Sequence, residues 1–90
     1  MFACPVCGAE ELSVPPYESW PPSPGVVLSP PYHRTLGGAS FEICPNCGFE
    51  FGYDDDAGAN GIGFSFEAWR TQWEQQGAAR WSSRRRRDGT

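Results

Sequence analysis

The chain has 90 residues, a formal net charge of −4 and a mean hydropathy of −0.50. This length allows one domain, and no stretch approaches the roughly 18 apolar residues of a membrane-spanning helix. No secretory or transit signal is evident either, so we expect a cytoplasmic protein without a membrane segment.

Side chains that build a hydrophobic core are scarce. Leu, Ile, Val and Phe together number 15 of the 90 residues, below the roughly 20% at which a chain begins to lack core formers. A small domain of this composition needs a further stabilising element. A structural metal could supply it, because its binding contributes roughly 10–16 kcal/mol to folding in small metallo-domains.

Charge is unevenly distributed along the chain. Residues 1–79 hold ten acidic residues against two arginines, a net charge of −8, whereas residues 80–90 hold five arginines against one aspartate, a net charge of +4. An acidic body repels phosphate groups, so nucleic acid is not the expected partner of the domain. The basic run Arg84–Arg87 leaves open a contact with nucleic acid or with an acidic protein surface.

The first motif from the N-terminus is a knuckle, CPVCG at residues 4–8, which recurs as CPNCG at residues 44–48. Proline after the first cysteine sets φ, and glycine after the second accepts a positive φ, so that backbone N–H groups can point at the sulfurs. Two such pairs are typical of a four-sulfur metal site. The predicted metal ligands are Cys4, Cys7, Cys44 and Cys47.

Zinc is the predicted ion of this site, although iron also occupies tetrahedral sulfur sites. Two disulfides are the alternative, but disulfides are rare in the cytosol.

The first knuckle leads into a predicted strand at Glu10–Val14 and then into a Pro-rich insertion, residues 15–38. Seven prolines between positions 15 and 31 exclude a central strand or a helix interior there. Three aromatic residues of this insertion either anchor it on the body or form a recognition surface for a partner protein: Tyr17, Trp20 and Tyr32.

The second knuckle lies between two segments in which apolar and polar residues alternate, Ala39–Ile43 and Phe49–Tyr53. A period of two predicts a hairpin with one apolar face, and the knuckle is its turn. Two hairpins that share one metal make a zinc-ribbon or rubredoxin-like body.

One amphipathic helix is predicted near the C-terminus. Ser65 is its expected N-cap, Glu67 lies in the first turn, and Gly77 can end it. Apolar side chains follow one face, where they pack on the hairpins or form an exposed docking surface: Phe66, Trp69 and Trp73, continued by Trp81.

Two further groups of residues bear on function. Asp54–Asp56 is the densest negative patch and could receive a basic partner, or it is a solvated loop. His33 is the only histidine and has no nucleophile beside it, while all four thiols are assigned to the metal. The sequence therefore predicts no enzyme.

Two strings, FEICPNCGFEFGYDD at residues 41–55 and SFEAWR at residues 65–70, resemble small bacterial cysteine-rich proteins of the CPCC type. The resemblance includes both knuckles and runs to about Trp81, but Val6 and Asn46 stand where that type doubles its cysteine. Relatives of the type occur near toxin–immunity loci. The resemblance implies a metal-stabilised interaction module, which could be an immunity-like binder, and no reaction.

The sequence thus predicts a small α+β zinc-ribbon-like domain over residues 1–81, with a disordered basic tail at residues 82–90. Its expected function is to bind another protein through the Pro-rich insertion, the acidic loop or both. The alternatives are an iron electron carrier, because the knuckles also resemble those of rubredoxin, and a nucleic-acid-associated zinc ribbon.

Overall fold

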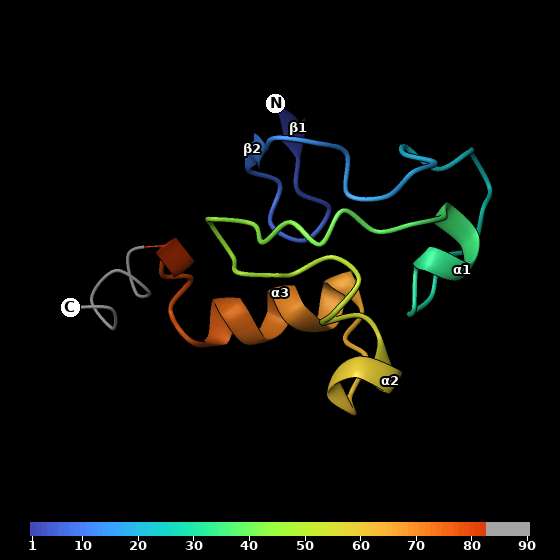
Figure 1. The fold of residues 1–90 in the computed structure, drawn as a ribbon. Coiled ribbons are helices and arrows are strands. Elements are labelled where there is room, and N and C mark those ends of the chain that lie inside the picture. The colour runs from blue at the N-terminus through green and yellow to red at the C-terminus, as the bar shows by residue number, and fades with distance from the viewer. Residues whose placement is uncertain (83–90) are drawn as a thin grey trace.

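Figure 1 shows the fold in a computed structural model, which describes residues 1–82. The elements are two strands and three helices in a small α+β arrangement: β1 (Phe2–Ala3), β2 (Glu10–Leu12), α1 (His33–Leu36), α2 (Ala57–Asn60) and α3 (Phe66–Gln75). The predicted basic run Arg84–Arg87 lies outside the described residues. No helix within the described range is long and apolar enough to cross a membrane.

Strands β1 and β2 form an antiparallel pair around the first knuckle, with Phe2 opposite Leu12. The predicted strand therefore exists, but it ends two residues early. The backbone N–H groups of Ser13 and Val14 donate to the Glu42 carboxylate, at 3.0 and 3.3 Å, and not to a neighbouring strand. This contact ties the end of β2 to the second hairpin.

The second hairpin is less regular than predicted. Around its knuckle only one β-bridge forms, between Ile43 and Glu50. Phe41 has a φ of +59°, which turns its side chain outward, 61% exposed, although the alternation predicted an inward ring. Phe49 and Phe51 are buried as expected. Figure 1 shows this segment between the β1–β2 hairpin and α3.

Helix α3 begins and ends much as the sequence predicts. The Ser65 hydroxyl accepts a hydrogen bond from the Ala68 N–H at 3.1 Å, the expected N-cap contact. At the other end the Ala78 N–H donates to the Trp73 carbonyl and the Gly77 N–H to the Glu74 carbonyl. This pair of bonds is a Schellman motif, in which glycine accepts the positive φ.

The prediction of a single helix was wrong, because two four-residue helices also form. Helix α1 follows the last prolines of the insertion, and α2 starts where the Asp56 carboxylate accepts from the Gly58 N–H at 2.9 Å. Both end at glycines with positive φ, Gly37 and Gly61. Helices this short lack the apolar periodicity by which longer ones are recognised.

The core is mainly aromatic. The Tyr32 ring stacks on Phe66 with centroids 3.9 Å apart, and Phe49 packs edge-to-face on Trp69 at 5.4 Å. The Pro-rich insertion supplies two of the buried rings, Tyr17 and Tyr32. The interpretation of Tyr17 and Tyr32 as anchors on the body is therefore confirmed, while Trp20 is only partly buried.

One buried carboxylate fastens the insertion to the rest of the domain. Asp55 is 0% exposed and accepts hydrogen bonds from the Tyr17 hydroxyl (2.7 Å), the Tyr32 N–H (3.0 Å) and the Gly52 N–H (2.8 Å). Burial, followed by the bond to Asp55, raises the pKa of Tyr17, so its hydroxyl keeps the proton that it donates. Buried charge of this kind is stable only while its donors remain in place.

We expect Asp55→Asn to lower the free energy of unfolding by about 2–4 kcal/mol, because an amide cannot accept from all three donors and leaves buried groups unsatisfied. The measurement is urea unfolding of metal-loaded protein followed by circular dichroism. The matched control is Asp56→Asn, which keeps an N-cap side chain on α2 and should cost about 0.5 kcal/mol or less. Equal losses for the two variants would contradict the role of Asp55.

Candidate metal centre

The two knuckles have the same local structure. In each, the glycine N–H donates to the carbonyl of the first cysteine at 2.8 Å, from Gly8 to Cys4 and from Gly48 to Cys44. Both glycines have a positive φ, +85° and +81°. The repeated turn lets backbone N–H groups approach sulfur, as the Val6 N–H approaches the Cys4 Sγ at 3.4 Å.

The structure brings the four predicted ligands together. Their Sγ atoms all lie within 4.8 Å of one another, although the two knuckles are separated by 35 residues of sequence, 9–43. The sulfurs of Cys4 and Cys47 are 3.8 Å apart and those of Cys7 and Cys44 are 3.7 Å apart. All four cysteines are free, so the disulfide alternative finds no support.

These separations fit a tetrahedral metal ion. Metal–sulfur bonds of about 2.3 Å place tetrahedral sulfurs about 3.8 Å apart. Two of the cross-knuckle distances therefore match the edges of such a tetrahedron. The four-cysteine cluster is the one group of three or more His, Cys, Asp or Glu side chains within residues 1–82 that is arranged to hold a metal.

Electrostatics of the cluster also favour a cation. Hydrogen bonding to Cys44 raises the pKa of the Cys4 thiol, and hydrogen bonding to Cys4 raises the pKa of Cys47. Hydrogen bonding from Cys4 lowers the pKa of Cys7 and lowers that of Cys44 to about 7. A divalent cation lowers the pKa of every thiol that it binds and so favours the thiolate at all four sulfurs.

Neighbouring groups hold the second knuckle in place. The Trp69 indole Nε1–H donates to the Cys47 carbonyl at 3.0 Å, and the Trp81 and Ser82 N–H groups donate to the Asn46 and Pro45 carbonyls at 2.8 and 3.0 Å. The Trp81 ring lies directly against Gly48, where a Cβ would be 2.4 Å from its Cδ1. Glycine is required there for this contact as well as for its φ.

A bidentate ion pair holds the C-terminal segment against the first hairpin. The Arg80 guanidinium contacts the Glu11 carboxylate at 2.5 and 2.8 Å, and this contact lowers the pKa of Glu11. Both side chains are partly exposed, so the pair positions this segment more than it stabilises the domain.

The other predicted functional residues lie away from the sulfurs. His33 is exposed on α1. The acidic loop is largely occupied by internal contacts: Asp54 accepts from the Glu50 N–H at 2.7 Å, Asp55 is buried, and Asp56 caps α2. The loop therefore offers less free negative charge to a partner than its sequence indicates.

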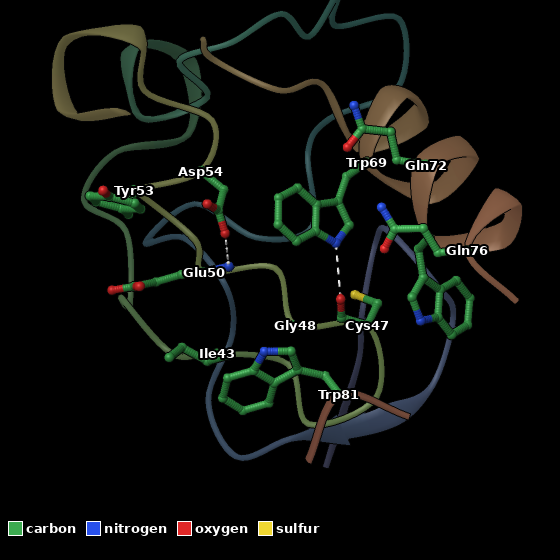
Figure 2. Close-up of a pocket in the computed structure, with 11 residues that line it drawn as sticks. Ile43, Cys47, Gly48, Glu50, Tyr53, Asp54, Trp69, Gln72, Gln76 and Trp81 are labelled. Atoms are coloured by element: carbon green, nitrogen blue, oxygen red, sulfur yellow. Dashed lines mark hydrogen bonds between the residues drawn. The ribbon is translucent and has the colours of Figure 1, made fainter. Parts of the chain in front are cut away.

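A groove beside the metal centre was not predicted as a unit. We call it the tryptophan groove, and Figure 2 shows it between α3 and the second knuckle. Its main lining residues are Trp69, Trp73 and Trp81 with Glu50, Asp54 and Gln76. The spacing of Trp69 and Trp73 was visible in the sequence, but the position of Trp81 depends on tertiary contacts, the hydrogen bonds of the Trp81 and Ser82 N–H groups to the Asn46 and Pro45 carbonyls.

Comparisons with known proteins add one relative. No protein-family model matches the chain, and no solved structure matches it. The chain is similar to the uncharacterised protein YoaQ of Bacillus subtilis, with 30% identity over 86 residues that cover 84% of this chain and 59% of YoaQ. It therefore spans about three fifths of that relative's length, and its zinc-ribbon assignment stays a prediction.

We expect Cys44→Ser to abolish metal binding and remove at least about 5 kcal/mol of unfolding free energy, because metal binding contributes roughly 10–16 kcal/mol in small metallo-domains. Circular dichroism melts and metal analysis measure both effects. The control His33→Ala should change stability by about 0.5 kcal/mol or less, because this side chain is exposed. A cooperative melt retained by Cys44→Ser would contradict the structural role of the site.

Zinc uptake should release at least two protons at pH 7, because the raised pKa values of Cys4 and Cys47 keep these thiols protonated until the ion displaces the protons. Apparent affinity should then fall at least about a hundredfold for each unit by which pH is lowered, because each released proton contributes a factor of ten. Calorimetric titration in two buffers of different ionisation enthalpy counts the protons. A binding heat independent of the buffer would contradict this expectation.

Proposed function

We propose that this chain is a zinc-stabilised, non-enzymatic module that binds another protein. The observation that supports stabilisation by zinc is the closed set of four sulfurs. Three of the four cysteines are buried, and the four sulfurs together would fill every position of a tetrahedral ion, so no position would be left for water or substrate. Sites of this kind are structural, whereas catalytic zinc sites keep one position open.

The chemistry of the remaining residues supports a binding role over catalysis. All four thiols belong to one cluster, and the one histidine lies on α1, apart from it. The tryptophan groove is instead the kind of concave, partly aromatic surface at which proteins bind peptides. A reducing compartment such as the cytoplasm would keep the cysteines available for the ion.

A zinc ion would fix the surface as well as the fold. The second knuckle forms one wall of the tryptophan groove through Cys47 and Gly48, and α3 forms the facing wall. Because Cys44 and Cys47 would share the ion with the first knuckle, its loss would loosen this wall. Binding of a partner should therefore require the metal-loaded form.

Metal analysis tests the proposal most directly. Protein produced with zinc and iron both supplied should contain one zinc per chain and remain colourless. It should lose its cooperative melt on chelation and recover it with zinc, because the site supplies stability that the small core lacks. A red, reversibly reducible iron centre would overturn the proposal in favour of an electron carrier.

A pull-down then tests the binding role. Zinc-loaded protein and the Cys44→Ser variant serve as matched baits in extracts of the source organism. A protein partner retained by the loaded bait alone would support the proposal. Retention of nucleic acid by the zinc-loaded bait would instead favour the nucleic-acid-associated alternative.

A further inference from the structure

The two knuckles have the same backbone turn but different surroundings. Cys7 and Cys47 are the second cysteines of their turns, and each is followed by a glycine with a positive φ. Cys47 is 1% exposed, whereas Cys7 is the one cysteine of the four that is only partly buried. The sulfur cluster therefore has one accessible edge, and that edge lies at Cys7.

Tryptophan side chains cover the second knuckle and leave the first one open. The Trp69 indole N–H donates to the Cys47 carbonyl at 3.0 Å (Figure 2), and the Trp81 ring lies against Gly48, where a Cβ would be 2.4 Å from its Cδ1. At Gly8, the matching position of the first knuckle, an added Cβ would meet no atom of the described residues within 4 Å beyond its chain neighbours. A small reagent can therefore approach the cluster through the first knuckle more easily than through the second.

The Cys7 sulfur lies close to a buried sulfur of the other knuckle. Its Sγ is 3.7 Å from that of Cys44, which is 0% exposed. A disulfide would require these two atoms to approach by about 1.7 Å, since an S–S bond is about 2.0 Å long. Cys4, the other cysteine of the first knuckle, lies 3.8 Å from Cys47 and accepts from the Val6 N–H at 3.4 Å. Cys44 is therefore the sulfur best placed to react with an oxidised Cys7.

We propose that Cys7 is the site at which a hydroperoxide oxidises the metal centre, and that the product is a Cys7–Cys44 disulfide formed with release of zinc. This inference rests on the proposed zinc-stabilised function and adds a modification site to it. A thiolate is both the metal ligand and the nucleophile that peroxides oxidise, so the exposed ligand is also the reactive one. Disulfides of cytosolic proteins are usually transient and redox-sensing, as this one would be.

The oxidation takes place in two steps. The Cys7 thiolate attacks one oxygen of hydrogen peroxide, so that an S–O bond forms, the O–O bond breaks and hydroxide leaves with the electron pair. The Cys44 thiolate then attacks the Cys7 sulfur, so that the S–S bond forms, the S–O bond breaks and a second hydroxide leaves. Together the two thiolates lose two electrons, and one peroxide is reduced to two hydroxides, which take up protons from the solvent to give water.

The position of this disulfide determines what happens to the domain when zinc leaves. Two of the four ligands are consumed, and the remaining thiols of Cys4 and Cys47 cannot complete a tetrahedral site. The Cys7–Cys44 bond joins the first hairpin to the second, as the ion would do in the reduced protein. A disulfide within one knuckle would instead leave the two hairpins without a link. The proposed oxidation therefore exchanges one cross-link for another.

Peptide mapping of the unmodified sequence tests the assignment without any variant. The zinc-loaded 90-residue chain is treated with one equivalent of hydrogen peroxide, zinc release is followed with a chromogenic indicator, and free thiols are then alkylated. Trypsin separates the two knuckles, because the chain has no lysine and its first two arginines are Arg34 and Arg70. The two fragments should be joined by one disulfide, with Cys4 and Cys47 alkylated and one zinc released for each disulfide formed.

The same digest contains the results that would contradict the proposal. A disulfide within one fragment, a cross-link through Cys4, or alkylation of Cys7 after zinc release would overturn the assignment, while the zinc bound beforehand would leave the proposed function intact. Zinc release without a disulfide would overturn it as well. Protein that takes up no zinc at the outset would overturn the proposed function and, with it, this inference.

Two matched variants test the difference in access. Cys7→His and Cys47→His alter equivalent positions, and each removes one thiol while keeping a zinc ligand, because three cysteines and one histidine also form structural zinc sites. With zinc content checked first, Cys7→His should slow peroxide-driven zinc release at least about tenfold, because the accessible thiolate is lost. Cys47→His should leave the rate within about twofold of the parent, because its thiol is covered. Equal slowing in the two variants would overturn the proposal, and the mapping stands independently of both.

Discussion

Four sulfur atoms drawn from two distant knuckles impose the main constraint on this domain. The cross-knuckle separations of 3.7 and 3.8 Å set the second hairpin against the first, and α3 packs on the far side of the second hairpin through Phe49 and Trp69. With so few aliphatic residues, the layers could not be held by side-chain burial alone. The ion that fits this cluster would therefore determine both the stability of the domain and the relative position of its parts.

A second set of contacts, independent of sulfur, holds the Pro-rich insertion. Asp55 accepts hydrogen bonds from both buried tyrosines of the insertion, from the Tyr17 hydroxyl and from the Tyr32 backbone N–H. The Tyr32 hydroxyl in turn accepts from the Phe66 N–H at 3.0 Å. The insertion thus contributes aromatic rings to the core, and hydrogen bonds to other segments fix its position. A loop with seven prolines, which remove backbone donors, is ordered here in part by the Asp55 carboxylate of another segment and in part by backbone hydrogen bonds such as that from the Glu18 N–H to the Gly38 carbonyl.

The sequence allowed the four-cysteine cluster, the α3 cap and the first strand to be predicted, because each has a local signal in the chain. For the cluster that signal is the CPxCG pattern within each knuckle. The outward turn of Phe41 could not be predicted, since alternation assumes extended backbone and this residue has a positive φ. Helices α1 and α2 are too short for a periodic signal. The tryptophan groove could not be predicted because Trp81 reaches the second knuckle only through tertiary contacts. The burial of Asp55 could not be predicted either, because the sequence does not distinguish it from Asp54 and Asp56.

The division of the ligands between residues 4–7 and 44–47 has a consequence for biosynthesis. The first cysteine pair leaves the ribosome well before the second, so a nascent chain carries two sulfurs that cannot close a tetrahedron by themselves. Capture of an ion by all four sulfurs would therefore wait until the second knuckle has emerged. During that interval the early pair is exposed to oxidation and to competing soft metals, so folding of this protein should be sensitive to the redox state and the metal supply of the cell while the chain is being made.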